Sequence, residues 1–154
     1  MSISLGARPL TEADVPDFHT LDTDHAKAYD LDPVLTTASG RFFQRDGYSF
    51  VATGSAGRGF VIAQGTFNGQ AANVQISYAA AEGDRPAVLH ALFAAVAKAA
   101  YDSGVYELTA TVPTADNEAH EALGQTLFKP RPLTVFRRFL GSRAEIPADL
   151  GKPS

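Results

Sequence analysis

The segment from residue 73 to residue 113 constrains the fold most, because its hydrophobic periodicity changes twice. Apolar and polar residues alternate from Asn73 to Ala79, which is typical of a strand. From Pro86 to Asp102, apolar residues recur at four-residue spacing and Ala fills much of the remainder, which is typical of a helix packed on a sheet. A second alternating run follows at 105–112. We predict two parallel strands that this helix joins through a right-handed crossover.

The rest of the chain predicts shorter elements on either side of this segment. The acidic stretch from Asp22 to Asp32 is expected to form a loop or an irregular turn, and Asp32-Pro33 predicts the start of a helix that Gly47 ends. The other predicted elements are strands at 2–9, 48–52, 59–66 and 133–140 and helices at 12–21 and 116–128. In the strand at 73–79, alternation places three residues on one face: Val74, Ile76 and Tyr78. This order indicates an α+β fold, with a mixed, mostly antiparallel sheet, a central parallel pair and flanking helices.

Composition excludes several classes of protein. The 154 residues fit a single domain, expected at 1–141 with a mobile tail at 142–154. The chain has no Cys, which excludes disulfides and thiolate metal sites, and its four His lack metal-ligand spacing, so we expect no metal. The formal net charge of −4 argues against a nucleic-acid partner. No signal peptide or bilayer-length apolar run is evident, so we expect a cytoplasmic protein without a membrane partner.

The element order, together with the segment from Ala91 to Val112, resembles the GCN5-related N-acetyltransferase (GNAT) superfamily of acyl-CoA-dependent N-acyltransferases. The resemblance covers roughly Ile3 to Leu140. Four short segments are similar to a small group of bacterial GNAT-like proteins that have no settled activity: Gly47–Phe50, Gly59–Gln64, Ala100–Glu107 and Leu140–Arg143. This resemblance implies the GNAT fold and, as co-substrate, acetyl-CoA or another acyl-CoA.

The resemblance also implies where CoA would lie. The first parallel strand would face the pantetheine arm, and the loop and helix start after it would hold the pyrophosphate on free N–H groups. The implied cofactor-binding residues are Tyr78, Ala79, Ala80, Asp84, Arg85, Ala87 and Val88. The same Asp and Pro residues also suit an ordinary helix start.

The chain departs from the superfamily pattern at this corner. The usual loop reads Arg/Gln-x-x-Gly-x-Gly/Ala, and the matching positions here hold Asp84, Ala87 and Leu89. Pro86 supplies no N–H group, and Leu123 stands where the superfamily often has a general-acid Tyr. No catalytic residue is assigned.

Two functions therefore stay open from the sequence. The first is acyl-CoA-dependent transfer of an acyl group to a small-molecule or peptide amine. The second is a non-catalytic GNAT-like module that has lost CoA binding and acts as a homodimer or by binding a partner. The missing glycines and the missing Tyr motivate the second function.

Further polar residues are weaker candidates, and each has an ordinary structural explanation. The acidic cluster would border the acceptor cleft or form a solvated loop: Asp22, Asp24, His25, Asp30 and Asp32. Gln64, Gln75 and Glu107 lie on predicted strands, where Glu107 is either a general base or an exposed sheet residue. His90 is expected to be partly exposed and non-catalytic.

The C-terminal part combines basic and apolar residues. Four arginines would contact the 3′-phosphate of CoA or a partner, or protect a sheet edge: Arg131, Arg137, Arg138 and Arg143. In the predicted last strand, an apolar stripe faces the core or a dimer partner with exchanged strands: Leu133, Val135 and Phe139.

Overall fold

The computed structural model of the protein describes residues 5–140 and 148–150 and contains a five-stranded sheet with helices on both faces. The strands are β1 (Leu5–Pro9), β2 (Phe50–Gly54), β3 (Gly57–Asn68), β4 (Ala71–Gly83) and β5 (Leu108–Ala110). The helices are the 3-10 turn η1 (Glu12–Asp14), α1 (Val15–Ala28), α2 (Thr37–Asp46), α3 (Arg85–Asp102) and α4 (Asn117–Gln125). The predicted α+β class is confirmed.

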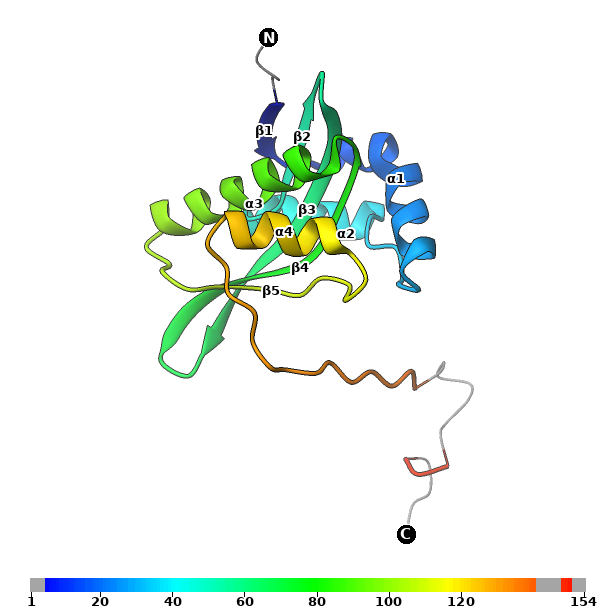
Figure 1. The fold of residues 1–154 in the computed structure, drawn as a ribbon. Coiled ribbons are helices and arrows are strands. Elements are labelled where there is room, and N and C mark those ends of the chain that lie inside the picture. The colour runs from blue at the N-terminus through cyan, green and yellow to red at the C-terminus, as the bar shows by residue number, and fades with distance from the viewer. Residues whose placement is uncertain (1–4, 141–147, 151–154) are drawn as a thin grey trace.

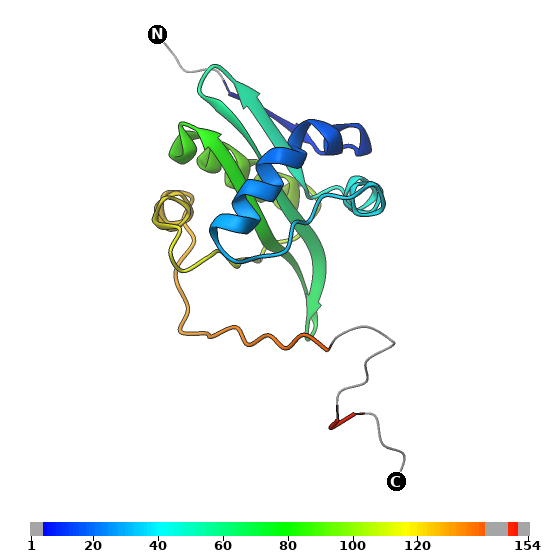
Figure 2. The same cartoon turned by 90° about the vertical axis from the view of Figure 1, so that its right-hand side faces the viewer.

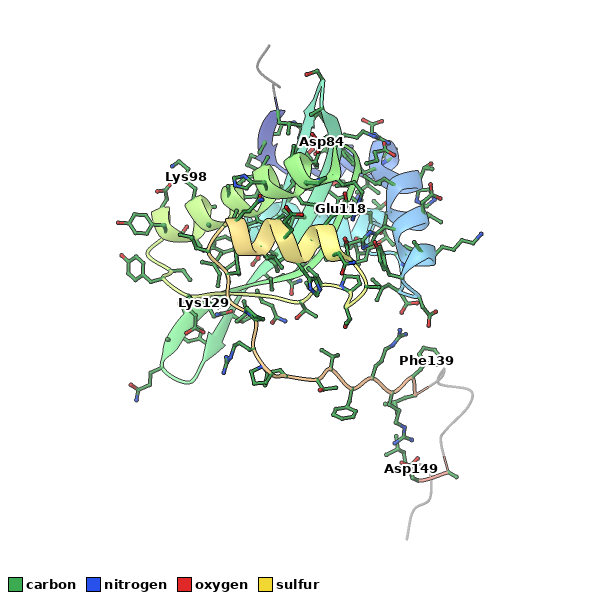
Figure 3. The ribbon with its side chains drawn as sticks, in the orientation of Figure 1. Asp84, Lys98, Glu118, Lys129, Phe139 and Asp149 are labelled. Carbon is green, nitrogen blue, oxygen red and sulfur yellow. The ribbon has the colours of Figure 1, made fainter. Side chains whose placement is uncertain are left out.

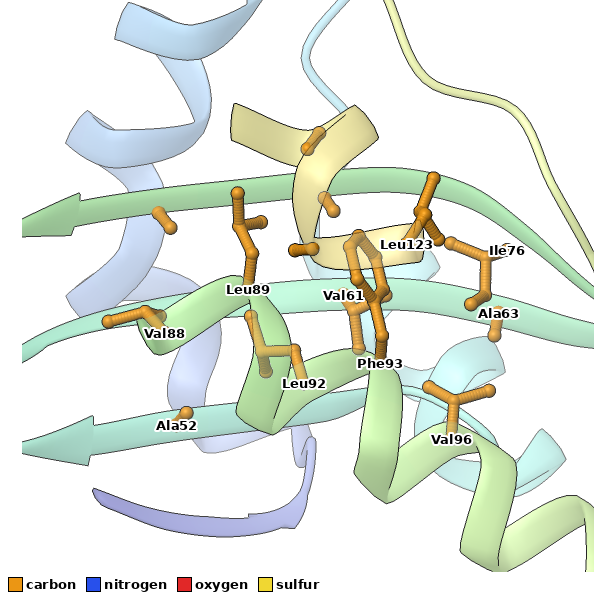
Figure 4. Packing of buried hydrophobic residues seen from close by; sticks show 14 of the residues in the cluster. Ala52, Val61, Ala63, Ile76, Val88, Leu89, Leu92, Phe93, Val96 and Leu123 are labelled. Carbon is orange, nitrogen blue, oxygen red and sulfur yellow. The ribbon is translucent and has the colours of Figure 1, made fainter. Parts of the chain in front are cut away.

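Among the described residues the strand order in the sheet is β1-β2-β3-β4-β5, with β4 and β5 parallel and the other neighbours antiparallel. Helices α3 and α4 cover one face of the sheet and α1 and α2 cover the other (Figures 1 and 2). Each face has its own core. On the α3 side, Leu89, Leu92 and Phe93 pack onto β3 and β4 (Figure 4). On the α1 side, Phe18 and Phe60 meet edge to face, with ring centroids 6.0 Å apart.

A β-bulge in β4 changes which residues share a face. Ile62 pairs with Tyr78 and Ala63 pairs with Ile76, so Ser77 is an extra residue without a partner on β3. Ile76 therefore lies in the core on the α3 side, whereas Tyr78 lies in the core on the α1 side. The prediction that Val74, Ile76 and Tyr78 share one face is wrong for Tyr78, because the extra residue reverses the alternation.

The two N-terminal helices differ in extent from the prediction. The acidic stretch predicted as a loop continues α1 to Ala28, because its apolar side, including Leu21 and Ala26, is buried on the sheet. Helix α2 starts after Thr36 rather than Asp32, since the Thr36 hydroxyl accepts a hydrogen bond from the N–H of Ser39. The predicted end of α2 is confirmed: Gly47 adopts a left-handed conformation with φ of 85°.

The C-terminal elements are shorter than predicted. Only Leu108–Ala110 of the run at 105–112 pairs in the sheet. The predicted last strand at 133–140 is wrong, because these residues are exposed and pair with none of the described strands. The predicted tail at 142–154 falls largely outside the described residues. Within the described part of the chain, no helix is long and apolar enough to cross a membrane.

Helix α3 lies close to β3 because Gly59 has no side chain. A Cβ at Gly59 would approach the carbonyl oxygen of Ala80 to 2.6 Å and Cγ1 of Val88 to 2.8 Å. We predict that Gly59→Ala lowers the free energy of unfolding by about 1–3 kcal/mol, because the strand and helix must separate. Gly65→Ala on the same strand is the matched control, since its nearest contact would be an ordinary 3.5 Å to Tyr48. Equal effects of the two variants in urea unfolding would contradict this account.

Candidate functional site

The candidate site lies where the two parallel strands stop pairing. The last residues of this pairing are Ile76 on β4 and Ala110 on β5. The N–H of Thr111 still donates to the carbonyl oxygen of Ile76, at 2.9 Å, and the chain then turns into α4. Strand β4 continues to Gly83. Its final part therefore faces the N-terminal ends of α3 and α4, a region that we call the β4–α4 gap.

The side chain of Arg85, the first residue of α3, bridges the β4–α4 gap. Its Nε donates to the carbonyl oxygen of Ala81 at 3.0 Å. Its Nη2 and Nη1 donate to the two carboxylate oxygens of Asp116, at 2.8 and 3.1 Å, and Nη1 also donates to Glu118 Oε1 at 2.5 Å. One guanidinium thus connects a strand to the start of α4. Figure 3 labels Glu118 on α4 and Asp84 at the start of α3, on the same side of the sheet.

The ion pair between Arg85 and Asp116 is almost removed from water. The Asp116 side chain is 1% exposed. Burial acts to raise the pKa of Asp116, but hydrogen bonds from Arg85 and from the N–H of Ala119 outweigh it and hold the pKa below its usual range. The same contacts raise the pKa of Arg85 despite its burial, led by the hydrogen bond to Asp116. The bidentate geometry explains how both charges remain buried.

Two backbone donors in the first turn of α3, the N–H groups of Ala87 and Val88, are satisfied by Asp84. Asp84 is the N-cap, and its Oδ1 accepts the N–H of Ala87 at 3.3 Å. The N–H of Val88 donates to the carbonyl oxygen of Asp84 at 3.0 Å, and Pro86 has no N–H. Asp84 is also the only residue between β4 and α3. The pyrophosphate loop that the sequence resemblance implied at 84–88 is therefore the N-terminus of α3, which follows β4 almost directly.

A second polar cluster lies on the α1 side of β4. Asp22 is fully buried, and its carboxylate accepts the backbone N–H groups of Val34 and Leu35 at 2.8–3.1 Å. The hydroxyl of Tyr78 donates to the carbonyl oxygen of Asp22 at 3.1 Å. The predicted pantetheine-facing strand residues are thus divided: the Tyr78 side chain and Ala80 lie in the α1-side core, and Ala79 lies in the α3-side core.

His25 of α1 packs between two aromatic rings in this cluster. Its ring centroid lies 4.8 Å from that of Tyr29 and 5.0 Å from that of Tyr78. Its Nε2 is buried and has no hydrogen-bond partner among the described residues. Burial lowers the pKa of His25, an effect that the negative charge of Asp116 partly opposes. His25 is therefore neutral at pH 7 and electrostatically coupled to the β4–α4 gap.

The other sequence candidates lie apart from the gap. Glu107 precedes β5 and accepts a hydrogen bond from Asn73 Nδ2 at 2.9 Å, toward the opposite end of β4 from Ala81. Gln64 and Gln75 are paired neighbours on β3 and β4. Gln75 and Glu107 are exposed, and so are the remaining described candidates: Asp24, Asp30, Asp32, His90, Arg131, Arg137 and Arg138. Arg143 lies outside the described residues, and no group of three potential metal ligands occurs in the described part of the chain.

Asp116 and Glu118 are site residues that no pattern in the sequence reveals. Their only local signal is the start of a helix, which Asp116 caps by accepting the N–H of Ala119 at 3.2 Å. Arg85 and Asp116 are 31 residues apart. Because no local pattern links such distant residues, only the packing of α4 beside α3 brings them together (Figure 1).

Comparison with known proteins places this arrangement in a family. A family model described as "Protein of unknown function (DUF1999)" matches residues 7–147. The chain belongs to the DUF1999 family. The wild-type crystal structure of TTHA1254 from Thermus thermophilus is 33% identical, with a TM-score of 0.72 and coverage of 90% of this chain and 99% of that one. No curated protein is matched by the sequence.

More distant solved structures share the fold of this DUF1999 chain. A ribosomal-protein-alanine N-acetyltransferase from Brucella melitensis biovar Abortus 2308 is 15% identical with a TM-score of 0.64, and covers 88% of this chain and 99% of its own. The aminoglycoside N-acetyltransferase AAC(6')-Iy, solved with CoA, is 12% identical with a TM-score of 0.59, and covers 90% and 97%. The chain therefore has a GNAT-like fold, as the sequence resemblance implied.

The residues of this DUF1999 chain do not fit the CoA that a GNAT fold implies. A pyrophosphate needs free N–H groups at the start of α3, but the carboxylate of Asp84 already occupies that position and binds the N–H of Ala87. On β4, the carbonyl oxygen of Ala81, next to the residues that would face pantetheine, accepts a hydrogen bond from Arg85. Two carboxylates, those of Asp116 and Glu118, already bind the Arg85 guanidinium, so a further anion there would meet net negative charge.

Removing the guanidinium tests the buried ion pair. We predict that Arg85→Met lowers the free energy of unfolding by about 3–5 kcal/mol, because the carboxylate of Asp116 stays buried without its partner. Lys98→Met is the matched control on the same helix: the pair of Lys98 with Asp102 is exposed, so its loss should cost at most about 0.5 kcal/mol. Urea unfolding at pH 7 measures the free energy of unfolding of both variants. A similar decrease in the two variants would refute the structural role of Arg85.

The buried histidine predicts a pH dependence of stability. The pKa of His25 is lower in the folded protein than in the unfolded chain, where it is about 6.5. As the pH falls below that value, the unfolded state binds a proton that the folded state does not, so the free energy of unfolding decreases with a slope of at most about 1.4 kcal/mol per pH unit.

We expect His25→Phe to flatten this slope between pH 7 and pH 5, whereas His90→Phe, at an exposed position on α3, leaves it unchanged. Urea unfolding at several pH values measures both slopes. If the His25 variant and the unsubstituted protein have equal slopes, the imidazole of His25 does not control how the free energy of unfolding depends on pH.

Proposed function

We propose that this chain is a GNAT-fold protein that acts by binding another polypeptide and not by acyl transfer from CoA. The observation that carries the proposal is that the chain's own side chains occupy this corner: Arg85 contacts Ala81, Asp116 and Glu118, and Asp84 caps the start of α3. A corner held by a buried bidentate ion pair opens only at a large energetic cost.

Exposed apolar residues support the binding of a polypeptide. Val135, Phe136 and Phe139 follow α4 and are 74%, 91% and 80% exposed. Clustered exposed aromatic and aliphatic side chains are typical of protein interaction surfaces. They lie on the C-terminal part of the chain, which Figure 3 shows beyond the sheet and its helices, with Phe139 labelled.

A second candidate function is transfer of an acyl group from acyl-CoA to a small-molecule or peptide amine. The observation that favours it is the divergence of β4 and β5 after Ile76, together with the buried Nε2 of His25, which has no hydrogen-bond partner among the described residues. The acetyltransferases among the structural neighbours point to the same chemistry, at the level of the fold.

Titration calorimetry with acetyl-CoA distinguishes the two functions. We expect no saturable heat and no increase in melting temperature at millimolar acetyl-CoA, because the anion sites are occupied by carboxylates. An N-acetyltransferase of known activity serves as the positive control. Saturable binding together with acetylation of any amine in a panel would reject the proposal.

A variant checks whether the ion pair is what excludes the ligand. In Arg85→Met/Asp116→Leu, apolar side chains replace the buried pair, which is often neutral or stabilising, and the carbonyl oxygen of Ala81 loses its donor. We expect this variant to remain folded and still not to bind acetyl-CoA tightly, since Asp84 and Pro86 keep the helix N-terminus closed. Micromolar binding by this variant would show that Arg85 alone keeps CoA out.

A further inference from the structure

His25 lies where the two faces of the sheet come close to each other. Strand β5 stops pairing with β4 after Ile76, which leaves the edge of β4 beyond Ile76 unpaired with β5. Figures 1 and 2 both show the C-terminal end of α1 beside the start of α4. His25 lies in the last turn of α1, and Asp116 is the N-cap of α4. The ion pair of Arg85 and Asp116 on one face therefore acts on an imidazole on the other face.

His25 is enclosed in the form of a neutral ring. It is 7% exposed and packs between the rings of Tyr29 and Tyr78. Its Nε2 is buried and has no hydrogen-bond partner among the described residues. Buried polar atoms are normally paired, so the unpaired Nε2 leaves room for a second state of this ring, in which Nε2 has a partner.

Among the described residues, the charged and titratable groups that face His25 come from α1, β4, α3 and α4. They are Asp22 and Tyr29 on α1, Tyr78 on β4, Arg85 on α3 and Asp116 on α4. Burial is the main influence on the pKa of His25 and lowers it, while the charge of Asp116 acts to raise it. The pKa of Tyr78 is raised mainly by burial, and that of Asp116 stays low despite burial, so neither group changes charge between pH 7 and pH 5. Acid therefore adds a proton to His25 and leaves Asp116 as a carboxylate.

A protonated His25 needs an acceptor, because both ring nitrogens of an imidazolium are donors and a buried charge without a partner is costly. The carboxylate of Asp22 is already engaged, since it accepts the N–H groups of Val34 and Leu35 at 2.8–3.1 Å. If Asp22 turned to the imidazolium, the buried N–H of Leu35 would lose its partner. Asp116 is therefore the carboxylate available to a protonated His25.

Arg85 can release Asp116 and still keep partners for its own charge. Its Nη1 also donates to Glu118 Oε1 at 2.5 Å, and its Nε donates to the carbonyl oxygen of Ala81 at 3.0 Å. The Glu118 side chain is 47% exposed, so Arg85 stays in contact with a carboxylate that reaches water. After the exchange, Arg85 pairs with Glu118 and the imidazolium pairs with Asp116. No buried charge is left alone, which keeps the energetic cost of the exchange low.

We propose that His25 operates a proton-dependent latch: when its ring takes up a proton, Asp116 leaves Arg85 and pairs with the imidazolium, and the β4–α4 gap opens. At pH 7 the ring is neutral, and the bidentate contact of Arg85 with Asp116 joins α3 to α4. In acid this contact is replaced by one between α1 and α4. The latch consists of contacts within the chain, so it is independent of the proposed function and goes beyond it by adding regulation of this corner by pH.

Nuclear magnetic resonance of the full chain between pH 7 and pH 5 tests the latch. The probe is solvent exchange of the guanidinium N–H protons of Arg85, corrected for the intrinsic effect of pH on exchange. We expect this exchange to rise by up to about tenfold for each unit that the pH falls toward the midpoint of the His25 titration, because one proton drives the opening. In His25→Phe, which keeps an aromatic ring between Tyr29 and Tyr78, the corrected exchange should not change with pH. Exchange that is independent of pH in the unsubstituted protein, or equally dependent on pH in His25→Phe, would overturn the proposal.

The midpoint of the His25 titration identifies the partner of the imidazolium. Asp116→Asn should move the midpoint to lower pH, because the imidazolium loses its counter-charge, and an Asn at this position still caps α4. Asp24→Asn is the matched control, an exposed acid-to-amide change next to His25 on α1, and should leave the midpoint unchanged. An unchanged midpoint in Asp116→Asn, or an equal shift in Asp24→Asn, would show that Asp116 is not the partner. Acetyl-CoA binding at pH 7 would refute the proposed function and leave the latch standing, so the two failures are distinguishable.

Discussion

The packing of α3 on the sheet is the interaction on which the rest of the structure depends. Its residues Val88, Leu92 and Val96 are fully buried against β3 and β4, and Gly59 allows the close approach. Burial of this kind stabilises a fold by about 25 cal/mol per Å² of apolar surface. Once α3 is placed, its first turn sets the position of Arg85, and its side provides the surface on which α4 lies.

Two features of β4 then give its faces different chemistry. The extra residue Ser77 turns Tyr78 toward α1, where it joins the buried cluster of Asp22 and His25. On the other face, the end of β4 accepts Arg85, which carries the ion pair to Asp116. Buried charges are costly to desolvate, so the two polar clusters fix the geometry of this region more than they stabilise it.

The comparison with acetyltransferases illustrates why fold and function are separate questions. The DUF1999 chain keeps the parallel strand pair and crossover helix of a GNAT fold. At the helix start, however, a carboxylate stands where that fold would bind an anion, and Arg85 takes the backbone acceptor on β4. Function depends on these few groups rather than on the sheet around them.

The sequence by itself determined the elements whose signals are local. The Gly47 cap, the strands β2 and β3 and the long helix α3 follow from glycine conformation and hydrophobic periodicity. Tertiary structure decided the rest. The bulge at Ser77 arises from pairing with β3, and Arg85 finds Asp116 across 31 residues. Periodicity records which side chains need burial, but only packing of distant segments decides what buries them.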